Sequence, residues 1–179
     1  SDSDDYEIER EIGRGGDGSV YLGYDKKVGR QVALKLIKSF RGSDDSVEQR
    51  FKAEVEAIAS MDHPNIIPIY SNGELDGRLF YSMKYVSGGS LATRMGEFAT
   101  PAEAVDLMCK IARGIHHAHE RGILHRDLKP SNVLLDEERE PFISDFGLAK
   151  KSTQESNLTV TGSIMGTPAY MSPEQARGD

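Results

Sequence analysis

Apolar residues recur at every second position over much of the stretch from residue 6 to residue 38, the spacing of strands with one buried face. The residues that carry this alternation are Tyr6, Ile8, Val20, Leu22, Tyr24, Val32, Leu34 and Leu36. Glycine-rich or polar stretches at 13–18 and 27–29 interrupt it. We therefore predict three antiparallel strands joined by short turns.

The spacing then changes to that of an amphipathic helix over residues 46–61, with a Ser46-x-x-Gln49 capping box at its start. Two more strand candidates follow at 66–70 and 79–86. The turn between them contains two dipeptides that favour turns, Asn-Gly at 72–73 and Asp-Gly at 76–77. A five-stranded antiparallel sheet with one helix is the predicted first half.

The second half begins with a helix over residues 100–120. Thr100, a proline at position 101 and Glu103 make a strong helix start, and the apolar residues predict a buried stripe of Val105, Met108, Ile111, Ala112 and Ile115. Loops and short strands follow. The fold class is therefore α+β, with a strand-rich lobe at 1–86 and a helical lobe at 87–179, separated by a flexible Ser-Gly-Gly boundary at 87–89. We expect a ligand cleft where the lobes meet.

Composition narrows the class of protein. The 179 residues are 37% hydrophobic and 28% charged, which is typical of a folded protein, and the net charge of −7 argues against nucleic-acid binding. Cys109 is the only cysteine, so a disulfide within the chain or a cysteine metal site is excluded. An acidic start and the lack of any long apolar run favour the cytoplasm over a membrane span. The missing initiator Met and the abrupt ending lead us to expect a piece of a longer protein, which could be membrane-anchored elsewhere.

A glycine pattern, Gly13-x-Gly15-x-x-Gly18-x-Val20, lies between two predicted strands. Because a dinucleotide-binding fingerprint leads from a strand into a helix, that interpretation is weakened. Glycines allow backbone N–H groups to approach phosphate oxygens with no side chain in the way. A phosphate-binding loop and a plain glycine-rich hairpin both remain open on this motif alone.

Lys35 interrupts an otherwise apolar strand, and alternation turns it to the same side as Ala33. An inward ammonium group needs an anion, whereas a surface lysine on an edge strand needs none. Glu54 on the predicted helix could supply the carboxylate, with Glu56 as the competing choice. We favour Glu54 because its spacing from Phe51 places it nearer the buried side.

A third cluster, His125-Arg-Asp127-Leu-Lys129-Pro-Ser-Asn132, is followed by Asp145-Phe-Gly. A carboxylate and an amide oxygen, with phosphate oxygens, can hold Mg²⁺, which makes Asp145 and Asn132 the candidate metal ligands. Asp127 is then left to accept the proton of an attacking hydroxyl, and Lys129 to neutralise the γ-phosphate. A turn aspartate or a capping asparagine would explain each residue singly, but not their joint order.

Taken together, these motifs resemble those of the eukaryotic-type (Hanks-type) protein kinases over residues 6–178. LKPSN with Lys129 resembles the serine/threonine kinases, and GTPAYMSPEQA at 166–176 the bacterial members. The resemblance implies a bilobal kinase fold with a partial helical C-lobe. It also implies ATP and Mg²⁺ as cofactors and the transfer of a γ-phosphoryl group to Ser or Thr hydroxyls of protein substrates.

The resemblance also implies finer roles. Met83 aligns with the gatekeeper, the backbone of Lys84 and Val86 with the adenine-binding hinge, and Ile58, His125 and Phe146 with the hydrophobic spine. The remaining residues implied at the nucleotide are Ile12, Gly13, Gly15, Gly18, Val20, Ala33, Lys35 and Leu134.

Regulation is implied by Arg126, because in such kinases this arginine pairs with a phosphorylated residue of the activation segment. The segment runs from 145 to 174, and Thr159, Thr161, Ser163 and Thr167 are its candidate positions, the first two as the main autophosphorylation sites. A kinase dimer for autophosphorylation is a further expectation.

Departures from the family pattern are mild: Asp17 in the glycine loop, Leu34, Lys84 in the hinge and Ser172 remove no catalytic group. The alternatives are a pseudokinase that binds ATP without catalysis and a small-molecule phosphotransferase of similar fold. We expect the isolated 179 residues to be inactive or nearly so, because a complete kinase domain continues with several more helices.

Overall fold

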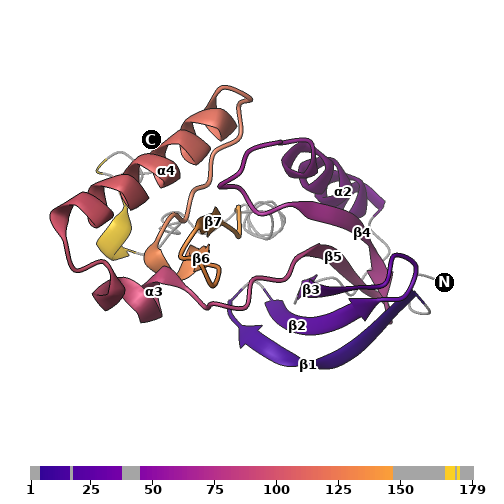
Figure 1. The fold of residues 1–179 in the computed structure, drawn as a ribbon. Coiled ribbons are helices and arrows are strands. Elements are labelled where there is room, and N and C mark those ends of the chain that lie inside the picture. Colours follow the sequence, from indigo (N-terminus) through magenta and orange to yellow (C-terminus); the bar gives the residue numbers. More distant parts are fainter. Residues whose placement is uncertain (1–4, 17, 38–44, 147–167, 172, 174–179) are drawn as a thin grey trace. The chain divides into compact units, whose positions relative to one another are not determined.

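The computed structural model of the chain describes residues 5–16, 18–37, 45–146, 168–171 and 173. They divide into two compact units (Figure 1). The described residues of the first unit lie within 5–60 and 68–85, and those of the second within 61–67, 86–146 and 168–173. Each unit has its own sheet and its own buried residues, so each can be understood separately.

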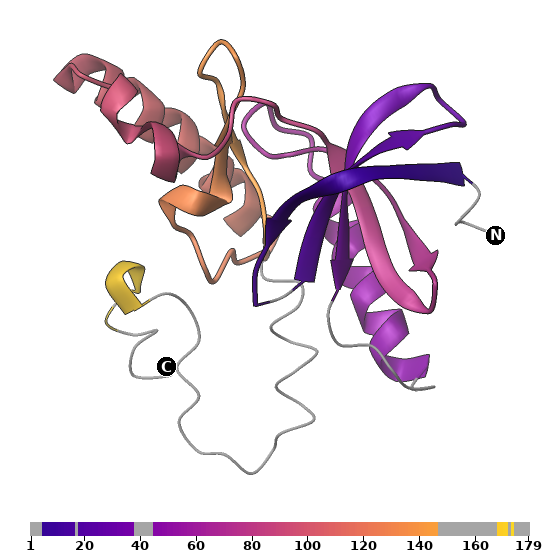
Figure 2. The ribbon, with the colours of Figure 1, turned by 90° about the horizontal axis from the view of Figure 1, so that it is seen from below.

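The first unit is built on a five-stranded antiparallel sheet, as predicted from the alternating pattern. Its strands are β1 (Tyr6–Arg14), β2 (Gly18–Asp25), β3 (Arg30–Ile37), β4 (Ile69–Leu75) and β5 (Arg78–Lys84). Their order across the sheet is β1-β2-β3-β5-β4. In Figure 2 the strands cross one another at an angle, which displays the twist of the sheet.

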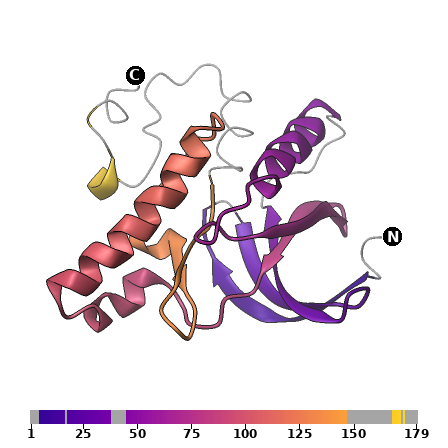
Figure 3. The same ribbon diagram turned by 45° about the horizontal axis from the view of Figure 1, so that its top comes forward.

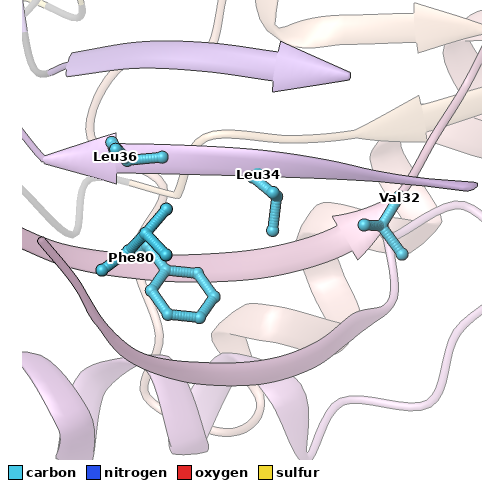
Figure 4. Packing of buried hydrophobic residues seen from close by; sticks show 5 residues of the cluster. Val32, Leu34, Leu36 and Phe80 are labelled. Carbon is cyan, nitrogen blue, oxygen red and sulfur yellow. The ribbon is translucent and has the colours of Figure 1, made fainter. Parts of the chain in front are cut away.

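One face of this sheet holds the core that the alternation in β3 predicts. Val32, Leu34 and Leu36 are fully or almost fully buried there and pack with Leu75 and Phe80 (Figure 4). Because successive side chains of a strand point to opposite faces, the intervening residues of β3 lie on the other face.

Tyr6 links the first strand to the opposite edge of the sheet. Its hydroxyl group lies 2.6 Å from Ser71 Oγ in β4 and 3.2 Å from Ser82 Oγ in β5, and its ring packs edge-on against Phe80 at 5.4 Å between centroids. These contacts close the core cluster on this face.

Helix α2 (Asp45–Ala59) covers the other face of the sheet and lies beside β4 in Figure 1. From residue 48 onward, where burial is described, Phe51, Val55 and Ile58 are its buried residues. The Phe51 ring stands 6.4 Å from the ring of Tyr81 in β5. The predicted helix is thus present, although it begins one residue earlier and ends two residues earlier than the pattern indicated.

The prediction for the strands after α2 was wrong in two respects. Ile66 and Ile67, expected to begin a strand of the first sheet, instead join the second unit, where Ile67 N donates to Ile143 O at 3.0 Å. The β4–β5 turn falls at Asp76–Gly77, both with positive φ (51° and 75°), while the earlier Asn-Gly pair lies inside β4.

The second unit contains α3 (Leu91–Arg94), α4 (Pro101–His119) and a two-stranded sheet of β6 (Val133–Leu135) and β7 (Pro141–Ile143). Single 3-10 turns lie at 95–97, 130–132 and 168–170. Figure 3 shows α4 running past α3 and the β6–β7 hairpin. Within the described residues, no helix combines the length and apolar character needed to cross a membrane.

Helix α4 begins as its sequence predicts. Thr100 accepts a hydrogen bond from Glu103 N at 3.2 Å, and the Glu103 carboxylate accepts one from Thr100 N at 3.1 Å, which completes a capping box. Proline occupies the first helical position, where its missing N–H costs nothing.

The predicted buried stripe of α4 was largely wrong. Val105 and Met108 are 62% and 57% exposed, Ala112 is also exposed, and of the predicted stripe only Ile111 is buried. The buried residues are Leu107, Ile111, Gly114 and Ala118. The helix approaches β7 closely at Gly114: a Cβ there would stand 2.7 Å from Ile143 Cδ1, so any larger residue would require the buried Ile143 side chain to move.

Candidate active site

The first unit places Lys35 where an anion is required. Lys35 lies in the middle of β3, is 8% exposed, and pairs with Tyr81 on the sheet face that α2 covers. On α2, Glu54 is half-buried whereas Glu56 is exposed, in line with the preference drawn from spacing. The geometry therefore favours Glu54 as the carboxylate on the packed side of the helix.

The glycine loop joins β1 to β2, and its glycines meet different constraints. At Gly18 a Cβ would overlap the carbonyl oxygen of Leu36 in β3, so packing alone requires glycine there. At Gly15 a Cβ would meet nothing within 4 Å, and the Gly15 amide donates to Gly18 O at 2.9 Å. Packing in this unit therefore does not explain a glycine at position 15.

The residues implied at the adenine divide between the units. Ala33 and Met83 are paired across β3 and β5 on the same face as Lys35, and Val20 pairs with Lys35. Ile12 and Gly13 are half-buried in β1. Val86 and Leu134 belong to the second unit.

The amide of Lys84, a predicted hinge residue, donates to Pro68 O at 3.0 Å. This N–H is therefore already committed within the first unit, so any contribution of Lys84 to adenine binding would come from its carbonyl group.

The second unit brings the candidate catalytic residues together. Asp127 and Asn132 are 9% and 8% exposed, and Asn132 Nδ2 donates to Asp127 O at 2.8 Å. Lys129 Nζ lies 3.1 Å from Asp127 Oδ2. The Asp127 carboxylate is thus buried beside the Lys129 cation, and the backbone carbonyl of Asp127 is held by the Asn132 side chain.

Asp145 is brought to this cluster by the β6–β7 hairpin. Val133 pairs with Ile143, so the residue before β6 and the residues after β7 meet at one end, where Ser144 N donates to Asn132 O at 2.9 Å. Ser144 Oγ donates to the same oxygen at 3.2 Å. Asp145, the next residue, has a positive φ of 59°. The hairpin therefore explains how two residues 13 positions apart, Asn132 and Asp145, come to the same place.

His125 is buried and hydrogen-bonds to the backbone of both Asp127 and Ser144. The His125 side chain is 3% exposed, and its ring lies 4.7 Å from the ring of Phe146. Its Nε2 is 2.8 Å from Ser144 O, and its Nδ1 accepts a hydrogen bond from Asp127 N at 3.3 Å. Because a carbonyl can only accept and the amide can only donate, a single neutral tautomer with the proton on Nε2 satisfies both bonds. Burial lowers the pKa of His125, partly opposed by the bond to Ser144 and the charges of Asp145 and Asp127.

The candidate metal ligands fit a cation that also binds phosphate. The Asn132 amide has committed Nδ2 to a backbone carbonyl, so Oδ1 is its atom for a metal, and Asp145 adds a carboxylate. Across the described part of the chain, no group of three or more His, Cys, Asp or Glu residues forms a metal site. An amide oxygen and a carboxylate are oxygen ligands of the kind that Mg²⁺ takes together with phosphate oxygens.

Not every predicted position can be placed. Thr159, Thr161, Ser163 and Thr167 lie outside the described residues. Arg126 is half-buried, with a positive φ of 63°. Sequence reasoning missed Ser144, whose two hydrogen bonds to Asn132 O belong to no sequence motif.

A comparison with family models matches residues 6–179 to the protein kinase domain. The chain is 40% identical to the serine/threonine-protein kinase PrkC of Bacillus subtilis, and 41% identical to the DNA damage-responsive serine/threonine-protein kinase RqkA of Deinococcus radiodurans. Both alignments cover 97% of this chain but only 27% and 26% of those proteins. The chain thus spans about a quarter of the length of these curated relatives.

Among solved structures, a crystal structure of the Mycobacterium tuberculosis PknI kinase domain aligns with a TM-score of 0.72 at 29% identity. It covers 97% of this chain and 64% of that one. The predicted α+β kinase fold, with its five-stranded sheet, is therefore confirmed.

The chain belongs to the protein kinase family. Within that family it groups with bacterial serine/threonine-protein kinases, which confirms the resemblance seen in its motifs.

Proposed function

We propose that this chain carries the nucleotide-binding and catalytic residues of a protein serine/threonine kinase that transfers the γ-phosphoryl group of Mg·ATP to Ser or Thr hydroxyls of proteins. The observation that carries the proposal is the cluster in the second unit, where Asp127, Lys129 and Asn132 are tied together at 2.8–3.1 Å. Family membership supports the reaction class.

Asp127 is the residue that receives the proton. In the proposed step the substrate hydroxyl oxygen forms a bond to the γ-phosphorus, the bond between that phosphorus and the bridging oxygen of the β-phosphate breaks, and ADP leaves. The hydroxyl proton passes to the Asp127 carboxylate. Lys129, 3.1 Å from that carboxylate, places positive charge where the transferred group gathers negative charge.

Asn132 and Asp145 are proposed to hold Mg²⁺, which when bound neutralises the charge of the phosphate oxygens. The bonds from Ser144 to Asn132 O keep the two ligands at one end of the hairpin. In the first unit we assign Lys35, oriented by Glu54, to the α and β phosphates, and the amides around Gly15 to the phosphate oxygens. Adenine would lie against Val20, Ala33 and Leu134, with Val86 and Lys84 at its edge.

Regulation is proposed to act through phosphorylation of the activation segment on Thr159 or Thr161, with Arg126 forming an ion pair with the phosphorylated residue. The same proposal has three further parts: protein substrates for the kinase, a kinase dimer that performs this autophosphorylation, and a cytoplasmic position of these residues. Mass spectrometry of the ATP-treated full-length protein should find phosphate on one of these threonines. Phosphate found only outside residues 145–174 would contradict it.

The decisive experiment is a radiolabelled ATP assay on the full-length protein with three forms: wild type, Asp127→Asn and Lys35→Met. We expect transfer to a protein substrate from the wild type and its near-complete loss in both variants. Equal activity in all three would disprove the site assignment. ATP binding without transfer by the wild type would instead support the pseudokinase alternative.

A further inference from the structure

The segment after the predicted hinge is held against strand β6 as if it were a third strand. Leu135 N donates to Gly89 O at 2.8 Å, and Ser90 forms a bridge with Leu134. Gly88 lies so close to β6 that a Cβ would overlap the carbonyl oxygen of Leu135. The sequence predicted a flexible boundary at 87–89, but Gly89 and Ser90 are bonded to strand β6.

Arg94, the last residue of α3, bridges this segment and the end of β6. One of its nitrogens, Nη1, donates to Gly88 O at 3.1 Å and to Asp136 O at 2.9 Å. Its side chain is 17% exposed. Hydrogen bonds from a charged donor are roughly twice as strong as neutral ones, so one guanidinium group fastens two backbone segments that are 48 positions apart (88 to 136).

The other side of the same guanidinium group is oriented by Glu97. Nε and Nη2 donate to the two carboxylate oxygens at 2.8 and 2.7 Å, an arrangement that fixes the plane of the fork. A surface ion pair three residues apart contributes little by itself. The effect of the Arg94–Glu97 pair is to orient the guanidinium group, so that Nη1 points at the carbonyl groups of Gly88 and Asp136.

These contacts adjoin residues that the proposed function needs. Val86 is two residues before Gly88, Leu134 lies opposite Ser90, and β6 continues directly from Asn132. We propose that Arg94 is a positioning residue for the adenine end of the nucleotide site: by clamping residues 88–90 to β6, it fixes Val86 and Leu134 at the spacing that the purine requires. The inference rests on the proposed function, since it presumes that ATP binds here.

The clamp leaves the chemistry at Asp127 untouched, because the bonds among Asn132, Asp127 and Ser144 involve neither Arg94 nor residues 88–90. Removing it therefore weakens ATP binding rather than phosphoryl transfer. In full-length Arg94→Ala we expect the KM for ATP to rise about tenfold, a loss of about 1.4 kcal/mol of binding, with kcat changed less than about twofold. Arg94→Lys, which keeps the charge but not the fork, should lie between this variant and wild type.

Arg139→Ala is the matched control. Arg139 also contacts Glu97, through the backbone O at 3.0 Å, and holds Glu103 at 3.2 Å, but none of its hydrogen bonds reaches residues 88–90. We expect it to lower stability without changing the KM for ATP.

A second measurement needs no nucleotide. Hydrogen exchange of the Leu135 amide, which is bonded to Gly89 O, should be faster in Arg94→Ala than in wild type and unchanged in Arg139→Ala.

The two measurements separate the inference from the proposed function. An active wild type whose KM for ATP is unaffected by Arg94→Ala, or raised equally by Arg139→Ala, overturns the inference alone. A wild type that binds no ATP overturns the proposed function, and the exchange rate of Leu135 then decides whether the clamp exists. If Arg94→Ala fails to fold, Arg94→Lys provides the same comparison.

Discussion

Replacing the two glycines Gly15 and Gly18 by alanine should separate the packing role of the loop from its role in binding. At Gly15 a Cβ meets nothing within 4 Å and φ is not positive, so alanine should be neutral or stabilise by up to about 0.5–1 kcal/mol through the unfolded chain. At Gly18 the overlap with Leu36 O requires backbone movement between β2 and β3, which costs about 1–3 kcal/mol.

Binding should show a different pattern. If phosphate oxygens approach the backbone at Gly15, the new methyl group displaces them, and losing one charge-assisted hydrogen bond of about 1.5–3 kcal/mol weakens ATP binding roughly 10- to 100-fold. Thermal unfolding without nucleotide and calorimetric titration with Mg·ATP, both on the full-length protein, measure the two effects. A Gly15→Ala variant with wild-type ATP affinity would refute the phosphate loop, and a Gly18→Ala variant with unchanged Tm would refute the packing argument.

Three further predictions concern the lysine partner, the buried histidine and the cap of α4. Glu54→Gln should lower kinase activity at least about tenfold by removing a charged partner, whereas Glu56→Gln should match wild type; equal loss would reverse the assignment. Because the pKa of His125 is lowered on folding, the unfolded chain binds its proton first, so stability should fall as pH drops below the ordinary value of 6.5. Urea unfolding at neutral and mildly acidic pH should show a smaller dependence in His125→Gln, and an identical dependence would contradict this. Thr100→Ala should cost about 1 kcal/mol in the same measurement, while Thr100→Ser should cost little.

Local patterns predicted most elements of the first unit, because the alternation of a strand depends on residues close together in the sequence. Alternation in β3 correctly identifies the buried Val32, Leu34 and Leu36, and Thr100 with Glu103 identifies a helix start from four residues. In β2 the same pattern failed at Tyr24, which is 39% exposed. The errors arose where the position of a segment depends on contacts with residues far away in the sequence. Ile66 and Ile67 are as apolar as any strand, and only their bonding to Ile143 assigns them to the other unit.

The same reasoning explains what could and could not be predicted of the candidate site. The joint order of the motifs predicts Asp127, Asn132 and Asp145 as site residues, because chance would not place them together in this order. Ser144 and Arg94 act through backbone carbonyls far along the chain, and a serine or an arginine in a polar stretch gives no periodic or compositional signal. Such supporting residues become visible only when the hairpin brings their partners together.

Gly114 in α4 has a consequence for efforts to make this protein more heat-resistant. Replacing a helical glycine by alanine normally stabilises by about 1 kcal/mol, so a routine survey would choose position 114 early. Here the added methyl group would press on fully buried Ile143, whose successors in the chain are Ser144 and Asp145. Overpacking typically costs about 1–3 kcal/mol, so the helix would gain propensity while the protein lost stability, and the disturbance would begin two residues from a proposed magnesium ligand.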